Sequence, residues 1–64
     1  MMFTIEEIYL IRSCNSKNKT KIIDVLEGYL KSTDFGMVEM ADNALAKLKD
    51  ASDKEFLELI NYPL

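Results

Sequence analysis

Two matching capping patterns constrain the fold of this chain more than any other feature of its sequence. "TIEE" at residues 4–7 and "SDKE" at residues 52–55 each place a hydroxyl residue three positions before a glutamate. In a capping box, the hydroxyl accepts a hydrogen bond from the glutamate amide, and the glutamate carboxylate accepts one from the amide of the hydroxyl residue. Apolar residues occupy the hydrophobic-staple positions around both boxes: Phe3 with Ile8, and Ala51 with Phe56. The sequence therefore predicts helices that begin near residues 4 and 52.

Apolar spacing predicts two further helices between these boundaries. In the clearest segment, residues 36–50, Val38, Ala41, Leu45 and Leu48 repeat at the 3-4-3 spacing of a packing seam. Apolar and polar residues also separate onto two sides of a helix over residues 18–31. We expect an all-α fold, a compact bundle of three to four short helices at about residues 4–13, 18–31, 36–50 and 52–60. These helices would form a single domain over residues 1–64, with the third helix at its centre.

The expected buried faces follow from the same spacing. Ile5, Ile8 and Ile11 form the stripe of the first helix, and Leu10 falls on its opposite side. The following residues are expected to face the core from the second and fourth helices: Ile22, Ile23, Val25, Leu26, Tyr29 and Leu30, then Phe56, Leu57, Leu59 and Ile60.

The small size of the chain favours self-association. A chain of 64 residues buries only about 60% of its unfolded surface, so its core contributes little stability. One cysteine and no histidine exclude an internal disulfide and a structural zinc site. Small domains also gain stability by associating with a partner. The partner expected here is a second copy of the chain.

The carboxylates are interpreted as structural. Glu6 and Glu7 are adjacent, so on a helix they diverge by about 100° and do not converge on one substrate. Glu7 is expected to cap the first helix, and Glu6 to favour its positive end. Asp53, Glu55 and Glu58 lack the ordered oxygen ligands and glycine turn of a calcium loop. We expect no metal and no cofactor.

Cys14 is interpreted as a partly buried thiol. A nucleophilic cysteine usually needs a histidine as its base, and the chain has none. The alternative is a reactive thiol whose pKa is lowered by Arg12, Lys17 and Lys19. Because no other catalytic pattern is present, the chain is not expected to be an enzyme.

One segment could contact nucleic acid. Arg12, Lys17, Lys19 and Lys21 are four cations in a stretch without any acid, as in a phosphate-binding patch. The net charge of −3 and the absence of aromatic residues from the stretch favour a solvated loop instead. A helix-turn-helix is disfavoured because Glu39 and Asp42 would meet phosphates.

A protein interface is the favoured alternative. Leu10 lies off the stripe of its helix, and Met37, Met40 and Ala44 widen the apolar arc of the third helix. Methionine provides an adaptable apolar contact surface. These residues are the candidate contact surface for a protein partner.

No membrane contact is expected, because the sequence lacks a run of about 20 apolar residues. The start of the chain lacks the basic and then apolar pattern of a signal peptide. A free thiol also fits a reducing compartment, so we expect the protein to be located in the cytoplasm.

Two segments carry a resemblance to a known group of proteins. "FTIEEI" at residues 3–8 and "ALAKLKDASDKEFLEL" at residues 44–59 resemble small proteins encoded on conjugative transposons of Gram-positive gut bacteria. The resemblance implies a mobile-element accessory protein in a bacterial cytoplasm, without a mechanism. Together with the residues above, it predicts a non-enzymatic accessory protein that acts through protein–protein contact. The alternative is a small DNA-associated regulator that uses the basic segment at residues 12–21.

Overall fold

The computed structural model describes residues 2–63, which form four helices: α1 (Ile5–Ser13), α2 (Lys19–Tyr29), α3 (Phe35–Asp50) and α4 (Asp53–Ile60). No strand occurs within this described range. The all-α prediction is confirmed, and every helix begins within one residue of its predicted start. The largest difference is at the end of α2, which stops at Tyr29 rather than near residue 31.

Every helix begins at a side chain that caps its free amide groups. Thr4 and Ser52 form complete capping boxes with Glu7 and Glu55. Their staple residues are buried as predicted (Phe3 with Ile8, and Ala51 with Phe56). Asn18 accepts a hydrogen bond from the Lys21 amide, and Asp34 accepts from the amides of Gly36 and Met37. Short polar side chains at these four positions therefore determine where the helices start.

The turn between α1 and α2 depends on Asn15. Its φ of 57° lies in the left-handed region, which asparagine tolerates better than most other residues. The Asn15 amide donates to the Arg12 carbonyl at 3.2 Å, and the chain then turns toward the Asn18 cap. This reversal places the loop of residues 14–18, which contains Lys17 and which we call the basic loop, beside the end of α1.

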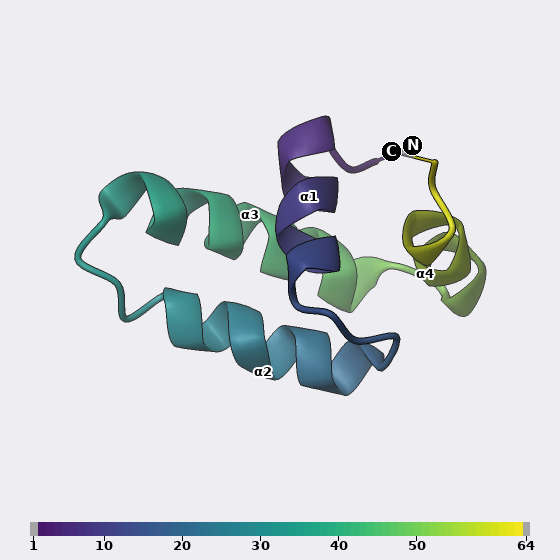
Figure 1. Cartoon of the computed structure of the whole chain (residues 1–64), viewed down its shortest axis with the longest axis horizontal. Helices are drawn as coiled ribbons and strands as arrows, with labels where there is room; N and C mark the ends of the chain where they lie inside the picture. Colours follow the sequence, from purple (N-terminus) through teal and green to yellow (C-terminus); the bar gives the residue numbers. More distant parts are fainter. Residues whose placement is uncertain (1, 64) are drawn as a thin grey trace.

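Helix α3 is central, as predicted. It packs mainly against α2 and α1. In Figure 1, α2 runs alongside α3 in the opposite direction, α1 crosses α3, and α4 lies near the far end of α3. The core residues that are almost fully buried come from all four helices: Ile8, Ile11, Ile22, Leu26, Ala41, Ala44, Leu48 and Leu59. The turn between α2 and α3 projects away from α1 and α4 (Figure 1).

The buried face of α1 differs from the expected stripe. Ile5 is 49% exposed, whereas Leu10 is only 8% exposed and belongs to the core. The face is rotated toward Glu7, which is buried because Lys47 of α3 neutralises its carboxylate at 2.7 Å. The prediction assumed that Glu7 faces solvent. Because Glu7 is buried instead, the true buried face of α1 is rotated relative to the predicted stripe.

Three further apolar residues are more exposed than expected. Val25, Leu30 and Leu57 were assigned to buried faces, but each has more than a third of its surface exposed. Helix α2 buries chiefly Ile22 and Leu26, so its packed face is narrower than its apolar face.

Candidate interaction surfaces

The residues predicted as an interface fall into two groups. Leu10 and Ala44 are buried in the core of the chain itself, so a partner cannot reach them in this fold. This corrects their assignment to a contact surface. Met37 and Met40 are half-buried and pack against the same core. Only the exposed parts of these two methionines remain available.

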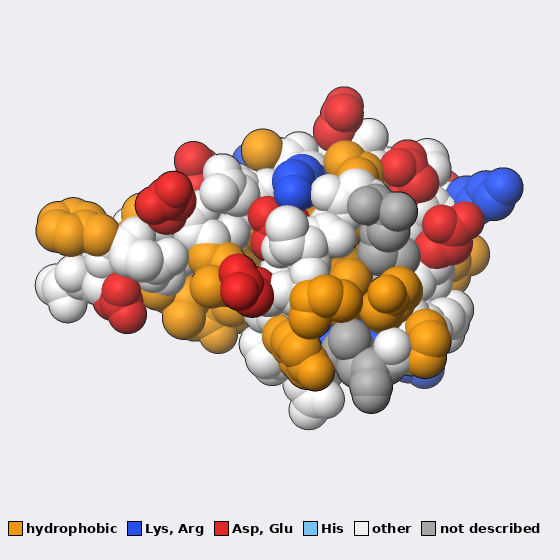
Figure 2. All heavy atoms as spheres, turned by 90° about the horizontal axis from the view of Figure 1, so that it is seen from above, with side chains coloured by type: hydrophobic (Ala, Val, Ile, Leu, Met, Phe, Trp, Pro, Cys, Tyr) orange, Lys and Arg blue, Asp and Glu red, His pale blue; other side chains and the backbone are white. Residues whose placement is uncertain are grey.

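The most exposed apolar side chain lies at the turn between α2 and α3. Phe35 is 84% exposed and is the first residue of α3. Leu30, which caps the end of α2, is 38% exposed. We call the turn of residues 30–35, with these two side chains, the tip. Figure 2 shows hydrophobic side chains at the extremity of this end of the molecule.

Phe35 lies one residue before the helix predicted over residues 36–50, so its exposed position at the start of α3 was not predicted. The informative signal was the Asp34 cap, which makes Phe35 the first residue of the helix. The Asp34 carboxylate accepts from the Gly36 amide at 3.0 Å and from the Met37 amide at 3.3 Å. The backbone under the exposed ring is therefore held in place by a helix cap.

The tip belongs to an acidic part of the chain. Residues 24–46 contain five acids (Asp24, Glu27, Asp34, Glu39 and Asp42) and a single base, Lys31. All six of these charged residues are exposed. Acidic side chains also lie close to the hydrophobic extremity in Figure 2. The tip itself carries one base, Lys31, and one acid, Asp34, so the excess of acid lies in the adjoining parts of α2 and α3.

The basic segment is divided by its internal contacts. Arg12 Nη1 donates to the Tyr62 carbonyl, and Lys19 Nζ donates to the Ala51 carbonyl at 2.8 Å. These two cations join α1 and α2 to the segments on either side of α4. Lys17 and Lys21 are exposed, and neither forms an ion pair within residues 2–63. Two of the four predicted phosphate contacts therefore have structural roles.

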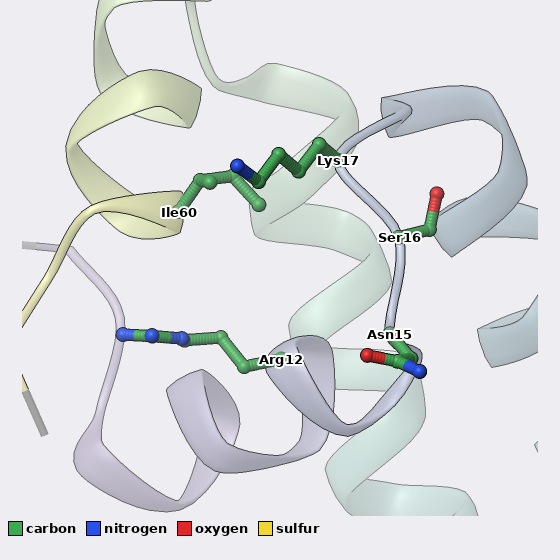
Figure 3. A pocket seen from close by; sticks show the side chains of 5 residues that line it. All are labelled: Arg12, Asn15, Ser16, Lys17 and Ile60. Carbon is green, nitrogen blue, oxygen red and sulfur yellow. The ribbon is translucent and has the colours of Figure 1, made fainter.

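A hollow of about 220 Å³ lies between the end of α1, the basic loop and the end of α4, and we call it the basic hollow. It is lined by Arg12, Asn15, Ser16, Lys17 and Ile60. In Figure 3, the Arg12 and Lys17 side chains both extend from their backbones toward the α4 side, where Ile60 lies. The lining thus combines two cations, two neutral polar groups and one apolar side chain, without any acid.

A second hollow, of about 290 Å³, lies between α1 and the start of α3. Its lining includes three acids (Glu6, Glu7 and Glu39) together with Thr4, Gly36, Met40 and Asn43. Glu7 is committed to structure because it accepts from the Thr4 amide at 2.8 Å and from Lys47 at 2.7 Å. Burial raises the pKa of Glu7, but the hydrogen bonds from Lys47 and Thr4 and the Lys47 charge outweigh it, so the pKa is lowered.

Comparison with protein families assigns the chain to one family. A family model described as "Putative transposon-transfer assisting protein" matches residues 3–63. The chain belongs to this family. No curated protein and no solved structure matches it. The transposon association implied by the sequence resemblance is therefore confirmed.

The match to the transposon-transfer assisting family includes both the tip and the basic hollow, because it spans residues 3–63. Within the described residues of this family member, no three His, Cys, Asp or Glu side chains gather as metal ligands. No helix in the described range is long and apolar enough to cross a membrane.

Cys14 lies at the end of α1, beside the basic loop of this transposon-transfer assisting family member. Its thiol contacts the Leu10 carbonyl at 3.6 Å and is partly buried. Burial raises the pKa of Cys14. The alternative expectation of a pKa lowered by neighbouring cations is therefore wrong.

Proposed function

We propose that this chain is a non-enzymatic accessory protein of a conjugative transposon, and that it acts in the bacterial cytoplasm through protein–protein contact made by the tip. Membership of the transposon-transfer assisting family supports the setting. The exposed apolar side chains of the tip support action through protein–protein contact.

The exposure of Phe35 is the observation that carries this proposal. Burying a phenylalanine side chain is worth about 1.5–3 kcal/mol, and at 84% exposure the chain gains little of it. The ring stands on a capped helix start, so little backbone ordering is needed when it meets a partner. Aromatic residues held in this way are typical anchors of protein interfaces.

Transfer of the element tests the tip directly. A donor strain that lacks the native gene would be complemented with the wild-type chain, with Phe35→Ala or with Leu57→Ala. We expect Phe35→Ala to reduce transfer about tenfold or more, as for loss of an interface anchor. Leu57→Ala is the matched control, because Leu57 is 59% exposed but lies on α4, away from the tip.

Circular dichroism and cellular protein level would establish that both variants fold and accumulate. A folded Phe35→Ala chain that restores wild-type transfer would refute the role of the tip. A loss with Leu57→Ala equal to that with Phe35→Ala would also contradict it.

A DNA-associated regulator is the second candidate, supported by the exposure of Lys17 and Lys21. Phosphate contact through these residues predicts binding that weakens with salt. It would also weaken on double charge reversal, Lys17→Glu with Lys21→Glu. A gel-shift titration at low salt measures both effects, and absence of a shift would reject this candidate. The internal bonds of Arg12 and Lys19 weigh against it.

A further inference from the structure

We propose that the tip of one copy of the chain docks in the basic hollow of a second copy, in a head-to-tail contact centred on Phe35. This inference rests on the proposed function, because it identifies a partner for the same tip. The occupant of the hollow is thus the end of another identical chain that carries the exposed Phe35 ring.

Charge complementarity is the first argument. The tip carries Lys31 and Asp34, and with the flanking Glu27 and Glu39 its exposed charges sum to −2. Of these acids, Glu27 also lies 3.9 Å from Lys49.

The hollow is lined by Lys17, by Arg12, whose Nη1 also donates to the Tyr62 carbonyl, and by no acid. Opposite potentials on two surfaces steer their encounter and fix their orientation. Within this one chain, therefore, each surface is suited to the other.

Size and chemistry of the lining are the second argument. A closed apolar cavity of about 150 Å³ can hold benzene, so a hollow of about 220 Å³ has room for a phenyl ring. Ile60 offers the ring an apolar contact, while Arg12 and Lys17 extend toward the same side (Figure 3). Cations are attracted to the face of an aromatic ring, so the lining suits Phe35 better than an aliphatic side chain.

The positions of the two surfaces require two copies. Three residues that line the hollow (Asn15, Ser16 and Lys17) directly precede α2. The tip lies at the other end of α2 (Figure 1). The 11 residues of α2 span about 16 Å at 1.5 Å per residue, so a tip cannot reach its own hollow. In such a contact, the tip of one copy meets the hollow of the other. The pair therefore still has one free tip and one free hollow, to which further copies can add.

The contact is small, which sets the conditions of the test. An interface centred on one aromatic side chain lies at or below the lower end of the usual size range, about 1,200 Å². We therefore expect weak association that grows with protein concentration and falls as salt screens the charges.

Sedimentation equilibrium of the full chain at low salt measures this association. The average mass of the wild-type chain should rise with concentration and return toward that of the monomer at high salt. Phe35→Ala removes the tip, and Lys17→Glu reverses a charge of the hollow. Each variant alone should raise the dissociation constant about tenfold or more.

Mixing the two variants gives the decisive result. The Phe35→Ala chain retains an intact hollow, and the Lys17→Glu chain retains an intact tip. An equal mixture should therefore regain association, limited to one copy of each, because the remaining tip and hollow are both defective. The controls Leu57→Ala and Lys54→Glu change exposed α4 residues outside both surfaces and should associate like the wild type.

Two outcomes would overturn the inference, and a third would overturn the proposed function instead. A wild-type chain that stays monomeric at the highest soluble concentration excludes self-docking, as does a mixture of the two variants that stays monomeric. If transfer still requires Phe35 in that case, the proposed function stands with a different partner. If the wild type self-associates through these residues but transfer ignores them, the proposed function fails instead.

Discussion

Glu7 connects a local helix signal to the tertiary structure. Its carboxylate caps α1 through the Thr4 amide and also binds Lys47, which is 40 residues away along the chain. The cap was predictable because it depends on residues three positions apart. The ion pair was not, because it requires the crossing of α1 over α3. Because Glu7 is buried, the apolar face of α1 includes Leu10 and excludes Ile5, unlike the predicted stripe.

Acid should destabilise the chain partly through Glu7. The folded pKa of this carboxyl lies below the usual value of 4.5, so its contribution is complete above that pH and is lost as pH falls through the folded pKa. We expect a loss of about 1.5–3 kcal/mol, as for hydrogen bonds to a charged group. Urea unfolding followed by circular dichroism, at pH values above and below 4.5, measures the loss.

The Glu7→Gln variant should be less stable at neutral pH and less sensitive to acid than the wild type. Glu6→Gln is the matched control because Glu6 is the exposed neighbour, and it should retain most of the acid sensitivity. Equal acid sensitivity in Glu7→Gln and the wild type would contradict the role assigned to the ion pair.

Cys14 should react slowly in the folded chain. Its thiol is partly buried at the end of α1 and its pKa is raised, so the thiolate that reacts is scarce at neutral pH. We expect the rate of alkylation at neutral pH to increase about tenfold or more on unfolding in urea. Mass spectrometry at timed intervals measures the rate, and equally rapid labelling of the folded chain would contradict the prediction.

At the scale of the elements, helix starts were more predictable than helix faces. Side chains at four N-caps specify the starts, and each acts within three residues of its own position. The faces depend on which neighbour a helix meets, so Leu10 and Ile5 exchanged their expected environments. For the same reason, the candidate surfaces could be predicted only in part. The cations at residues 12–21 were found, but the exposure of Phe35 and the inclusion of Ile60 in the hollow were not.

The central position of α3 makes one of its alanines sensitive to size. Ala44 is fully buried, so Ala44→Leu should overpack the core and cost about 1–3 kcal/mol. Ala46→Leu is the control on the exposed side of the same helix, where the change should stay within about 0.5 kcal/mol. Thermal and urea unfolding measure both variants. Equal stability of the two would show that α3 does not pack through Ala44.

At the scale of the whole molecule, charge and apolar exposure are unevenly distributed. α2 begins beside the basic loop and ends at the tip, whose Phe35 is exposed, while α3 returns along it (Figure 1). The paired α2 and α3 therefore join two surfaces of opposite character. Their packing keeps the two surfaces apart, which favours contacts between molecules over contacts within one.

Local stability should also vary across the molecule, with α4 opening first. Packing between helices is concentrated between α2 and α3 and between α1 and α3. By contrast, α4 has only eight residues and is held by buried Phe56 and Leu59, with Lys19 and Arg12 bonded to the adjoining backbone. Short elements with few packed neighbours open at lower free energy than the central core.

Native-state hydrogen exchange followed by nuclear magnetic resonance measures this difference. We expect α4 amides to be protected less than those of α2 and α3. Leu59→Ala, which truncates a buried α4 side chain, should lower α4 protection more than α3 protection, within a total cost of about 2–5 kcal/mol. Equal loss in both helices would mean that α4 unfolds only with the whole chain. In that event, the Ile60 side of the basic hollow would open only at the free energy of global unfolding, as the core helices do.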